Sequence, residues 1–372
     1  MKKLFKKIPN KPHIAFFIGT EAEFIKVFPV TVELDRQGIK YSIIASGQNI
    51  LTNSLLFTYI DHKNIDLTLS SGPAKQTPFA LMFWFILTFI KGYFLMRTYL
   101  KQASIQVLLV HGDTISTVMG AYLGRILGMK VMHIEAGLRS FNFLHPFPEE
   151  IDRVLTSRVV DVHFSPNEWA LKNLDNISGK KINTIQNTLL DSLRIVTRKN
   201  INTELLRKVK NKKYFMFVMH RQENLMNESL VREIIDIILH QTKSLTCVFI
   251  IHKPTRVALE KYNLMSKVEK NKYIITTNRL PYIEIMNLMK RAEFLITDGG
   301  SNQEESYYFG KPCLILREHT ERIEGLDKNV LLSMNNLSTI KSFFKNYKVY
   351  ERKPITNSIQ PSKVIVEELK KV

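Results

Sequence analysis

The stretch VLLVHGDTISTVMGAYLGRILGMKVMHIEAGLRS, residues 107–140, decides the fold class. It contains two short apolar runs, Val107–Val110 and Val131–Ile134, separated by a segment long enough for a helix. Polar residues follow each run directly. Uninterrupted apolar strands that alternate with helices are typical of a parallel sheet covered on both faces. The stretch therefore predicts an α/β fold.

The same alternation continues on both sides of this stretch. The first series of expected strands is Ile14–Ile18, Tyr41–Ala45, Val107–Val110, Val131–Ile134 and Val162–Phe164. The second series is Phe215–Val218, Cys247–Ile251, Tyr273–Thr276, Phe294–Thr297 and Cys313–Leu316. Two series of this kind predict two doubly wound, Rossmann-like domains. We expect the first domain at residues 1–188, the second at 189–355, and a C-terminal helix within 356–372 that folds back on the first domain.

The composition is that of a globular and strongly basic protein. The 372 residues include 53 Lys+Arg and 34 Asp+Glu, which gives a net charge of +19. Such an excess suits nucleic acid, an anionic membrane face or a phosphate-rich substrate. No nucleic-acid-binding module is recognisable, so nucleic acid is not expected as a partner. The two cysteines, Cys247 and Cys313, lie in apolar runs, which indicates buried thiols in a cytoplasmic protein.

One segment of the first domain is unusually apolar. Residues 79–90, FALMFWFILTFI, carry no charge, and this uncharged run is shorter than the roughly 18–20 residues that span a bilayer. Within residues 79–100, an interfacial helix would hold Trp84, Tyr93 and Tyr99 at the headgroups of an anionic membrane. Burial against a second subunit explains the same composition. The sequence leaves both alternatives open: a cytoplasmic protein peripheral on the inner face of the membrane, or a homodimer.

Candidate functional residues stand directly after the predicted strands, where α/β sheets bind their ligands. In the first half they are Asp113, Glu135, Arg139 and Glu149. In the second half they are His220, Arg221, His252, Gly299, Gly300, Ser301 and Arg317. The three carboxylates and His220 form a set suited to acid/base chemistry, whereas one carboxylate alone is more often a helix cap. The small residues Gly299–Ser301 precede an expected helix near Asn302, which suits a phosphate.

Neither a metal nor a nicotinamide cofactor is expected. The sequence has no HxxxH or Cys/His spacing for zinc, and no DxD run accompanies the carboxylates. The first strand is not followed by the G-x-G-x-x-G pattern of dinucleotide-binding folds.

Five ordered blocks resemble a known family. They are HGDT (111–114), HIEAGLRS (133–140), PFPEEIDRVLTSRVVDVHFSP (146–166), HRQEN (220–224) and the long block LPYIEIM…ERIEG (280–325). In order and spacing, from Gly19 to Leu332, the chain is similar to the non-hydrolysing UDP-N-acetylglucosamine 2-epimerases. The resemblance implies the GT-B architecture, with two Rossmann-like domains facing a central cleft. It also implies a UDP-sugar substrate, no metal or NAD, and a homodimer.

The resemblance further implies a reaction and the residues that perform it. A base removes the C2 proton while UDP leaves from C1, and re-addition after protonation on the other face gives the ManNAc epimer. By position, Asp113, Glu135 and Glu149 match the family's catalytic carboxylates, and His220 matches its catalytic histidine. The residues that match or adjoin its UDP-sugar contacts are Lys26, Arg139, Arg221, Gly300, Ser301, Glu305, Arg317 and Arg322. Of these, Glu305 matches the residue that holds the ribose hydroxyls.

The chain also departs from the family pattern. The first-strand motif GTRPE reads GTEAE, so an arginine expected near the diphosphate becomes Glu21. DSGG reads DGGS, and the QHR segment tied to allosteric control in bacterial members reads Gln48-Asn49-Ile50.

Two hypotheses about the function follow. The favoured one is a UDP-GlcNAc 2-epimerase that supplies ManNAc for cell-surface polysaccharide, and the alternative is a membrane-associated GT-B glycosyltransferase that uses a UDP-sugar and a lipid-linked acceptor.

Overall fold

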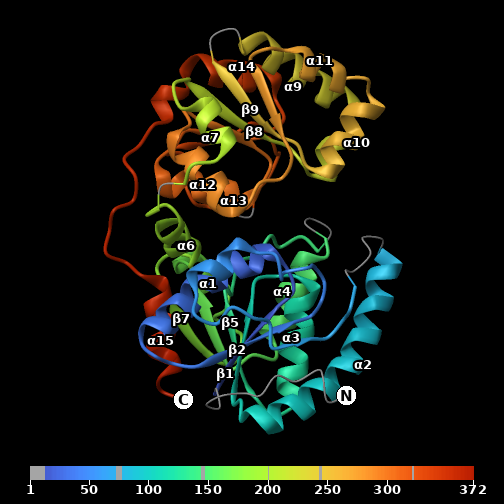
Figure 1. The fold of residues 1–372 in the computed structure, drawn as a ribbon, viewed down its shortest axis with the longest axis vertical. Helices are drawn as coiled ribbons and strands as arrows, with labels where there is room; N and C mark the ends of the chain where they lie inside the picture. Colours follow the sequence, from blue (N-terminus) through green and yellow to red (C-terminus); the bar gives the residue numbers. More distant parts are fainter. Residues whose placement is uncertain (1–12, 73–77, 144–146, 200, 243–244, 321) are drawn as a thin grey trace. The chain divides into compact units, whose positions relative to one another are not determined.

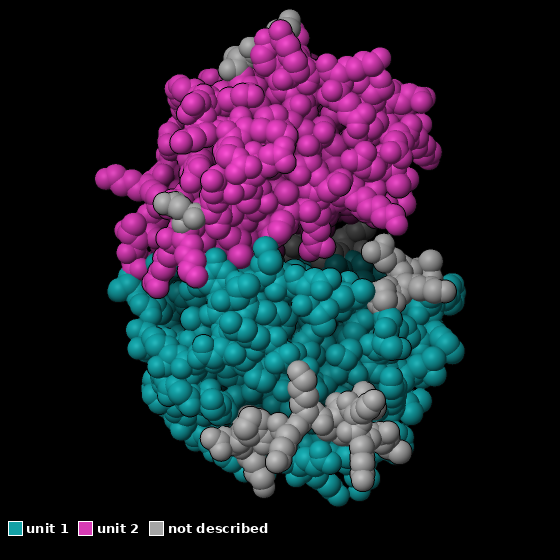
Figure 2. Space-filling view, viewed as in Figure 1, with its two compact units in different colours: residues 1–195, 358–372 teal, residues 196–357 magenta. Residues whose placement is uncertain are grey.

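The computed structural model describes residues 13–72, 78–143, 147–199, 201–242, 245–320 and 322–372. The chain divides into two compact units (Figure 2). Unit 1 comprises Met1–Ile195 and Ser358–Val372, and unit 2 comprises Val196–Asn357. Each unit is a parallel sheet with interleaved helices, so the predicted α/β class with two doubly wound domains is confirmed.

Unit 1 is built on a parallel sheet flanked by helices (Figure 1). The sheet has seven strands in the order β3-β2-β1-β4-β5-β6-β7. Its strands are β1 Ile14–Ile18, β2 Tyr41–Ala45, β3 Leu67–Thr68, β4 Val107–His111, β5 Lys130–Ile134, β6 Val162–Ser165 and β7 Lys180–Asn183. Its helices are α1 Glu21–Arg36, η1 Leu55–Tyr59, α2 Pro78–Ala103, α3 Ile115–Ile126, α4 Glu149–Ser157, α5 Glu168–Lys172, α6 Leu189–Val196 and α15 Pro361–Leu369. The C-terminal helix α15 packs against α1, and α6 ends where the chain passes into unit 2.

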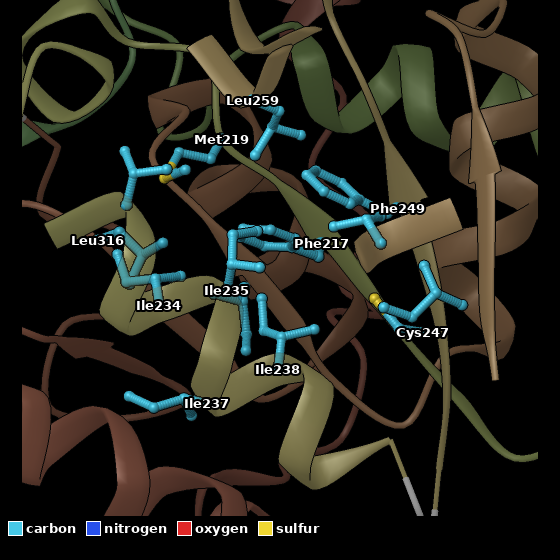
Figure 3. Packing of buried hydrophobic residues seen from close by; sticks show 14 of the residues in the cluster. Phe217, Met219, Ile234, Ile235, Ile237, Ile238, Cys247, Phe249, Leu259 and Leu316 are labelled. Atoms are coloured by element: carbon cyan, nitrogen blue, oxygen red, sulfur yellow. The ribbon is translucent and has the colours of Figure 1, made fainter. Parts of the chain in front are cut away.

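Unit 2 has a six-stranded parallel sheet with the order β10-β9-β8-β11-β12-β13. Its strands are β8 Tyr214–Val218, β9 Thr246–Ile250, β10 Ile274–Thr277, β11 Leu295–Thr297, β12 Cys313–Ile315 and β13 Val330–Leu332. Its helices are α7 Glu204–Val209, α8 Gln222–Leu225, α9 Glu228–Gln241, α10 Lys253–Lys261, α11 Met265–Lys270, α12 Tyr282–Arg291, α13 Gly300–Phe309, α14 Leu337–Asn346 and η2 Tyr347–Tyr350. Figure 3 shows part of its core, which includes Phe217 and Phe249. The centroids of these two rings lie 4.4 Å apart.

The predicted strands are observed, with ends that shift by one residue in several cases. Three edge strands, β3, β7 and β13, are absent from the two expected series. β3 and β13 have two and three residues, which is too short for a recognisable apolar run. β7 has the mostly polar sequence KKIN. Both cysteines are free and fully buried, as expected, and burial raises the pKa of the Cys313 thiol to about 12.

The order of the strands determines where a ligand can bind. In unit 1 the order reverses between β1 and β4, and in unit 2 it reverses between β8 and β11. Ligands of doubly wound sheets bind outside the carboxyl ends of the strands at such a switch point. The segments that follow these four strands begin at Gly19, Gly112, Met219 and Asp298. They contain or adjoin several of the candidate residues from the sequence.

Helix α2 has an inner face that belongs to the core of unit 1. Gly92 lies against Leu69 and Leu123, and Met96 is fully buried. The Tyr99 hydroxyl and the Ser42 hydroxyl lie 2.8 Å apart, and burial raises the pKa of Tyr99 to about 12. The expectation that Tyr99 meets lipid headgroups is therefore wrong, because helical spacing turns this residue inward.

Trp84 and Tyr93 also take part in the packing of unit 1. The Trp84 indole N–H donates to the Ser70 hydroxyl at 3.2 Å, and both aromatic rings pack against the buried cluster around Met96 and Leu100. Both side chains are therefore partly buried within unit 1. Among the described residues, Phe79–Ala103 is the one helix that is long and apolar enough to cross a membrane, judged by length and composition alone.

Candidate active site

Glu23 connects the two switch-point segments of unit 1. Thr20 caps α1 and Thr114 caps α3, and the Thr114 hydroxyl donates to the Glu23 carboxylate. The backbone N–H of Gly19 donates to the same carboxylate at 2.6 Å. Burial raises the pKa of Glu23 to about 7, the Thr114 and backbone hydrogen bonds act against it, and the charge of Asp113 adds to it. Glu23 thus fixes the end of β1 to the end of β4.

Glu135 is the most constrained of the candidate catalytic residues. It follows β5 with a φ of +68°, an unusual backbone conformation for a residue with a side chain. The Lys26 ammonium on α1 lies 2.8 and 2.7 Å from its two carboxylate oxygens, and the Asn187 amide also donates to it. Lys26, Glu135 and Asn187 are 5, 6 and 3% exposed. Lys26, which the resemblance assigned to the UDP-sugar, therefore binds a candidate catalytic carboxylate.

Helix α4 supplies the remaining carboxylates of unit 1. Its Glu150 accepts hydrogen bonds from Arg139 Nε at 2.5 Å and from the Ser140 N–H at 2.8 Å. Burial acts to raise the pKa of Glu150, but these donors lower it below its ordinary value. Arg153, one turn into the helix, places Nη2 2.5 Å from Asp113 Oδ2. The structure thus pairs Arg139 with Glu150 and pairs Asp113 with Arg153, an arginine of the matched block 146–166 to which no role was assigned from the sequence.

Asp152 is a further buried carboxyl beside this pair. It is 6% exposed, and its Oδ2 has no hydrogen-bond partner within the part of the chain that the structure describes. Burial raises its pKa to about 8, the charges of Asp113 and Glu149 add to the shift, and Arg153 opposes it. Asp113, Glu149 and Asp152 therefore form one electrostatically coupled group of carboxyls.

Glu21, which replaces the arginine of the family motif, is turned toward a neighbouring loop. Its Oε1 accepts a hydrogen bond of 2.7 Å from the Ser54 hydroxyl. Ser54 caps the short helix η1. The anionic side chain that replaces the family's arginine is thereby engaged within unit 1.

Asp298 organises the site of unit 2. This fully buried carboxylate follows β11 and accepts hydrogen bonds of 2.9 Å from the backbone N–H groups of both His220 and Arg221. His220 Nδ1 lies 3.0 Å from Asp298 Oδ1, and Asn224 Nδ2 donates to Oδ2 at 3.1 Å. Burial acts to raise the pKa of Asp298, but the His220 imidazole and the backbone donors lower it. The pair spans the β8/β11 switch point and orients the imidazole.

His252 stacks near this pair. Its ring centroid lies 5.0 Å from that of His220, at the start of α10. Burial, with the charges of His220 and Arg279, lowers the pKa of His252 to about 4. A neutral imidazole next to His220 is able to accept a hydrogen bond near neutral pH.

The glycine turn begins α13 and stands beside His220. The helix starts at Gly300, two residues before the expected position, so its first N–H groups belong to small residues. A Cβ at Gly299 would lie 3.3 Å from His220 Cε1 and 3.0 Å from Asn302 Oδ1, which explains a glycine at this position. Ser301, which is partly buried, thus lies among small residues at a helix N-terminus, where an anion is favoured.

The other predicted nucleotide contacts lie around α13. Glu305, one turn further along, is 3% exposed and accepts a hydrogen bond of 2.9 Å from Asn302 Nδ2. Arg322 is buried and pairs with Glu304 of the same helix, and Arg317 follows β12. Arg221 lies 3.3 Å from Glu223. The cations predicted for the diphosphate thus come from several segments of unit 2, and Arg322 already has a carboxylate partner.

Several residues of the site were missed by sequence reasoning. Asp298, Asn187 and Arg153 each bind a candidate residue that is distant in sequence. Glu23 binds Thr114, the neighbour of the candidate Asp113. Asp298 directly precedes the glycine turn, and Arg153 lies in the matched block 146–166, so both had a usable signal. Asn187 and Glu23 give no local signal because their partners are supplied by tertiary contacts. Within the described ranges, no three His, Cys, Asp or Glu side chains are grouped so that they would hold a metal ion.

Comparison with known proteins extends the resemblance to most of the chain. The family model described as UDP-N-acetylglucosamine 2-epimerase matches residues 32–352. The UDP-N-acetylglucosamine 2-epimerase of Methanococcus maripaludis is 34% identical over 330 residues, which cover 85% of this chain and 86% of that protein.

Two crystal structures are similar to this chain. One is the Methanocaldococcus jannaschii UDP-GlcNAc 2-epimerase in complex with UDP-GlcNAc and UDP. It has a TM-score of 0.78 and 28% identity, and the match covers 96% of this chain and 99% of that one. The other is the Neisseria meningitidis UDP-GlcNAc 2-epimerase bound to UDP-GlcNAc. Its TM-score is 0.81 at 27% identity, with 96% and 100% of the two chains covered.

Proposed function

Because this chain belongs to the UDP-N-acetylglucosamine 2-epimerase family and is thus a nucleotide-sugar isomerase, we propose how its residues interconvert UDP-GlcNAc and UDP-ManNAc. The reaction proceeds by elimination and re-addition of UDP without a metal or nicotinamide. It takes place in the cytoplasm and supplies ManNAc for cell-surface polysaccharide. The observation that carries the proposal is the match over residues 32–352 together with three carboxyls of unit 1, Asp113, Glu149 and Asp152, whose charges act on one another.

The chemistry divides between the two units. In the elimination, the C2–H bond breaks and its proton passes to a carboxylate, while the C1–O bond breaks and UDP leaves with the electron pair. Protonation of the resulting 2-acetamidoglucal at C2 on the other face, with return of UDP to C1, completes the epimerisation. We assign the proton transfers to Asp113, Glu135 and Glu149 of unit 1. The positions of these residues support the assignment, since each follows a strand or begins a helix at the carboxyl edge of the sheet.

Unit 2 supplies the groups for the UDP moiety. His220, held by Asp298, and the N–H groups at the start of α13 suit the leaving diphosphate, whose negative charge grows as the C1–O bond breaks. Three further residues of unit 2 are candidates for the diphosphate. Arg221 is the neighbour of His220 in sequence, His252 lies beside the His220 ring, and Arg317 follows β12. Glu305 is the candidate for the ribose hydroxyls, since a carboxylate accepts two hydrogen bonds from a vicinal diol.

The experiment that tests the function is a panel of nucleotide sugars analysed by NMR. We expect UDP-GlcNAc to be converted to a mixture with UDP-ManNAc without an acceptor. Turnover that requires a lipid-linked acceptor, with no epimer formed, would instead indicate the glycosyltransferase alternative. That alternative is not favoured by the family match, which is to epimerases along most of the chain.

The outer face of α2 is a second functional surface. Seven large apolar side chains at helical spacing are 49–83% exposed: Phe79, Met82, Phe83, Ile86, Leu87, Ile90 and Phe94. A continuous apolar stripe of this kind on a protein surface marks an interaction site. We propose that a second copy of the chain covers it. The cations of this helix are Lys91, which is exposed beside the stripe, and the exposed Arg97 and Lys101 at one end of it. Three cations on a helix of 26 residues are fewer than the Lys/Arg-rich polar face of an interfacial lipid helix requires.

Sedimentation and vesicle flotation distinguish the two occupants. We expect a dimer for the parent chain and a monomer for the double variant Phe83→Lys/Leu87→Lys, with circular dichroism unchanged. The control Val257→Lys replaces an apolar side chain of unit 2 that is 56% exposed and lies outside the stripe, and this variant should stay dimeric. A monomeric parent that floats with anionic vesicles, and loses flotation in the double variant, would show that lipid covers the stripe.

A further inference from the structure

Glu135 is held by side chains from two different elements of unit 1. Lys26 reaches it from α1, and the Asn187 side-chain amide donates to its Oε2 from the start of α6. All three side chains are buried, so bulk water does not compete for these hydrogen bonds. The orientation of Glu135 therefore depends on where α6 begins.

Asn187 serves two purposes with one side chain. Its Oδ1 accepts a hydrogen bond of 3.1 Å from the Leu189 N–H, as a helix-capping residue does. Its Nδ2 is thereby directed to Glu135. Capping alone requires only the oxygen, and Ser or Asp would provide it as well. The amide nitrogen has a separate role, which is the hydrogen bond to the carboxylate.

A second residue of α6 fixes the other partner of the ion pair. The Ser192 hydroxyl donates to the backbone carbonyl of Ile25, the residue that precedes Lys26 on α1. Ser192 is fully buried. The first half of α6 thus contacts both the carboxylate and the backbone that carries the ammonium, so a displacement of α6 would move both members of the pair.

The other contacts of α6 join it to the places where the chain crosses between the units. The chain leaves unit 1 after Ile195, within α6, and returns at Ser358. Asp191 accepts hydrogen bonds from the Ser362 hydroxyl and from its N–H, the latter at 3.0 Å. Arg194 Nη1 donates to the Ile359 carbonyl at 2.5 Å. Both crossings are therefore attached to the helix that holds Glu135.

We propose that Asn187 is a positioning residue that holds Glu135 in its reactive orientation, and that α6 makes this orientation dependent on the two chain crossings. This inference rests on the proposed role of Glu135 in proton transfer. A carboxylate that must take or give a proton at one face of a sugar carbon requires a defined direction, and a misplacement of about 1 Å can cost about a hundredfold in rate.

The test is the rate at which deuterium from solvent replaces the C2 proton of UDP-GlcNAc. Asn187→Ser and Asn187→Asp both keep an oxygen able to cap α6 but lack the amide donor. We expect each to lower the exchange rate by at least about tenfold while UDP affinity changes less than about twofold. In Asn187→Asp the added carboxylate hinders ionisation of its neighbour, so the acidic limb of the pH–rate profile moves to higher pH. A purely structural role would not move this limb.

The matched control replaces another helix-capping asparagine. Asn227 caps α9 by accepting a hydrogen bond of 3.1 Å from the Leu230 N–H, far in sequence from Glu135. Asn227→Asp should leave the exchange rate and its pH profile unchanged. Exchange at the parent rate in both Asn187 variants would overturn the proposal, as would a loss of UDP affinity equal to the loss of rate.

A remote variant tests the connection to the crossings. Asp191→Asn weakens the bond to Ser362 without touching Glu135. We expect a severalfold slower exchange with unchanged UDP affinity, and a combined variant with Asn187→Ser that is no slower than Asn187→Ser alone. Exchange at the parent rate in Asp191→Asn would overturn this part. If Glu135→Gln itself exchanges at the parent rate, the proposed function fails; if only the Asn187 variants do, only this inference fails.

Discussion

Lys26 and Glu135 form a buried ion pair, with Nζ 2.8 and 2.7 Å from the two carboxylate oxygens although 109 residues separate them in sequence. The pair joins α1 to the end of β5, and Asn187 adds a third donor. It therefore ties a candidate catalytic group to the helix that follows the first strand. Because both side chains are buried from solvent, each partner depends on the other for charge compensation.

Lys26→Met should destabilise the fold and stop the reaction. Removal of one partner from a buried pair leaves an uncompensated charge and costs about 3–5 kcal/mol. We expect a lower thermal midpoint by calorimetry and loss of C2 exchange. The double variant Lys26→Met/Glu135→Gln should regain part of the stability but not the exchange. A single variant as stable as the parent would contradict the buried pair.

Asp152 should make the stability of unit 1 depend on pH. Its pKa in the folded chain, about 8, lies above its ordinary value, so the folded state binds this proton more tightly than the unfolded state. The contribution is full below about pH 4 and is lost as the pH rises through about 8.

Asp152→Asn removes this dependence, because the amide stays neutral. Thermal midpoints measured from pH 5 to pH 9 should fall with rising pH more steeply for the parent than for the variant. The variant should be the more stable of the two at pH 9. Parallel curves for the two proteins would show that Asp152 has no raised pKa.

Asp298→Asn should disable His220 while the backbone stays folded. The backbone N–H groups of His220 and Arg221 both donate to the Asp298 carboxylate. The side-chain NH₂ of an asparagine cannot accept these hydrogen bonds, and an unsatisfied buried donor lowers the free energy of unfolding by about 1–3 kcal/mol. The imidazole also loses its anionic partner, and we expect a roughly hundredfold lower turnover. UDP titration and steady-state assays provide the measurement, and Glu223→Gln, at an exposed carboxylate near Arg221, is the control.

The pH dependence of this variant follows from the lowered pKa of Asp298. A carboxyl with a depressed pKa stabilises the fold above its ordinary value, and the contribution is lost as the pH falls through the folded value. The parent should therefore lose stability on acidification below about pH 4 more steeply than Asp298→Asn. Equal acid sensitivity of the two proteins would contradict this assignment.

Glu21→Gln should have little effect on UDP binding. The Glu21 carboxylate accepts a hydrogen bond from Ser54, and a glutamine oxygen can accept the same bond. We expect UDP affinity within about twofold of the parent at low and high salt. A rise of about tenfold or more at low salt would mean that the carboxylate repels the diphosphate directly.

The α/β class and most strands are predictable because continuous apolar runs report burial on both faces of a parallel sheet. β1 and β2 have the expected bounds to the residue. The partners of Glu135 and His220 are not predictable in this way. Asn187 and Asp298 reach their partners only after the strands are ordered in the sheet, so neither neighbouring sequence nor periodicity indicates the pairing.

Helix α2 illustrates the same limit from another direction. Its composition is apolar on every face, so the sequence does not distinguish the side that packs from the side that is exposed. The structure buries Met96 and Tyr99 and exposes Phe83 and Leu87. The packing of Gly92 against Leu69 and Leu123 sets this rotation, and these contacts join segments distant in sequence.

The most direct test of the epimerase function is NMR of UDP-GlcNAc incubated with the protein in deuterium oxide. We predict loss of the C2 proton signal together with new UDP-ManNAc signals that carry deuterium at C2. Glu135→Gln should bind UDP normally and leave the C2 proton in place. Retention of the C2 proton by the parent protein, with UDP-GlcNAc demonstrably bound, would contradict the proposed reaction.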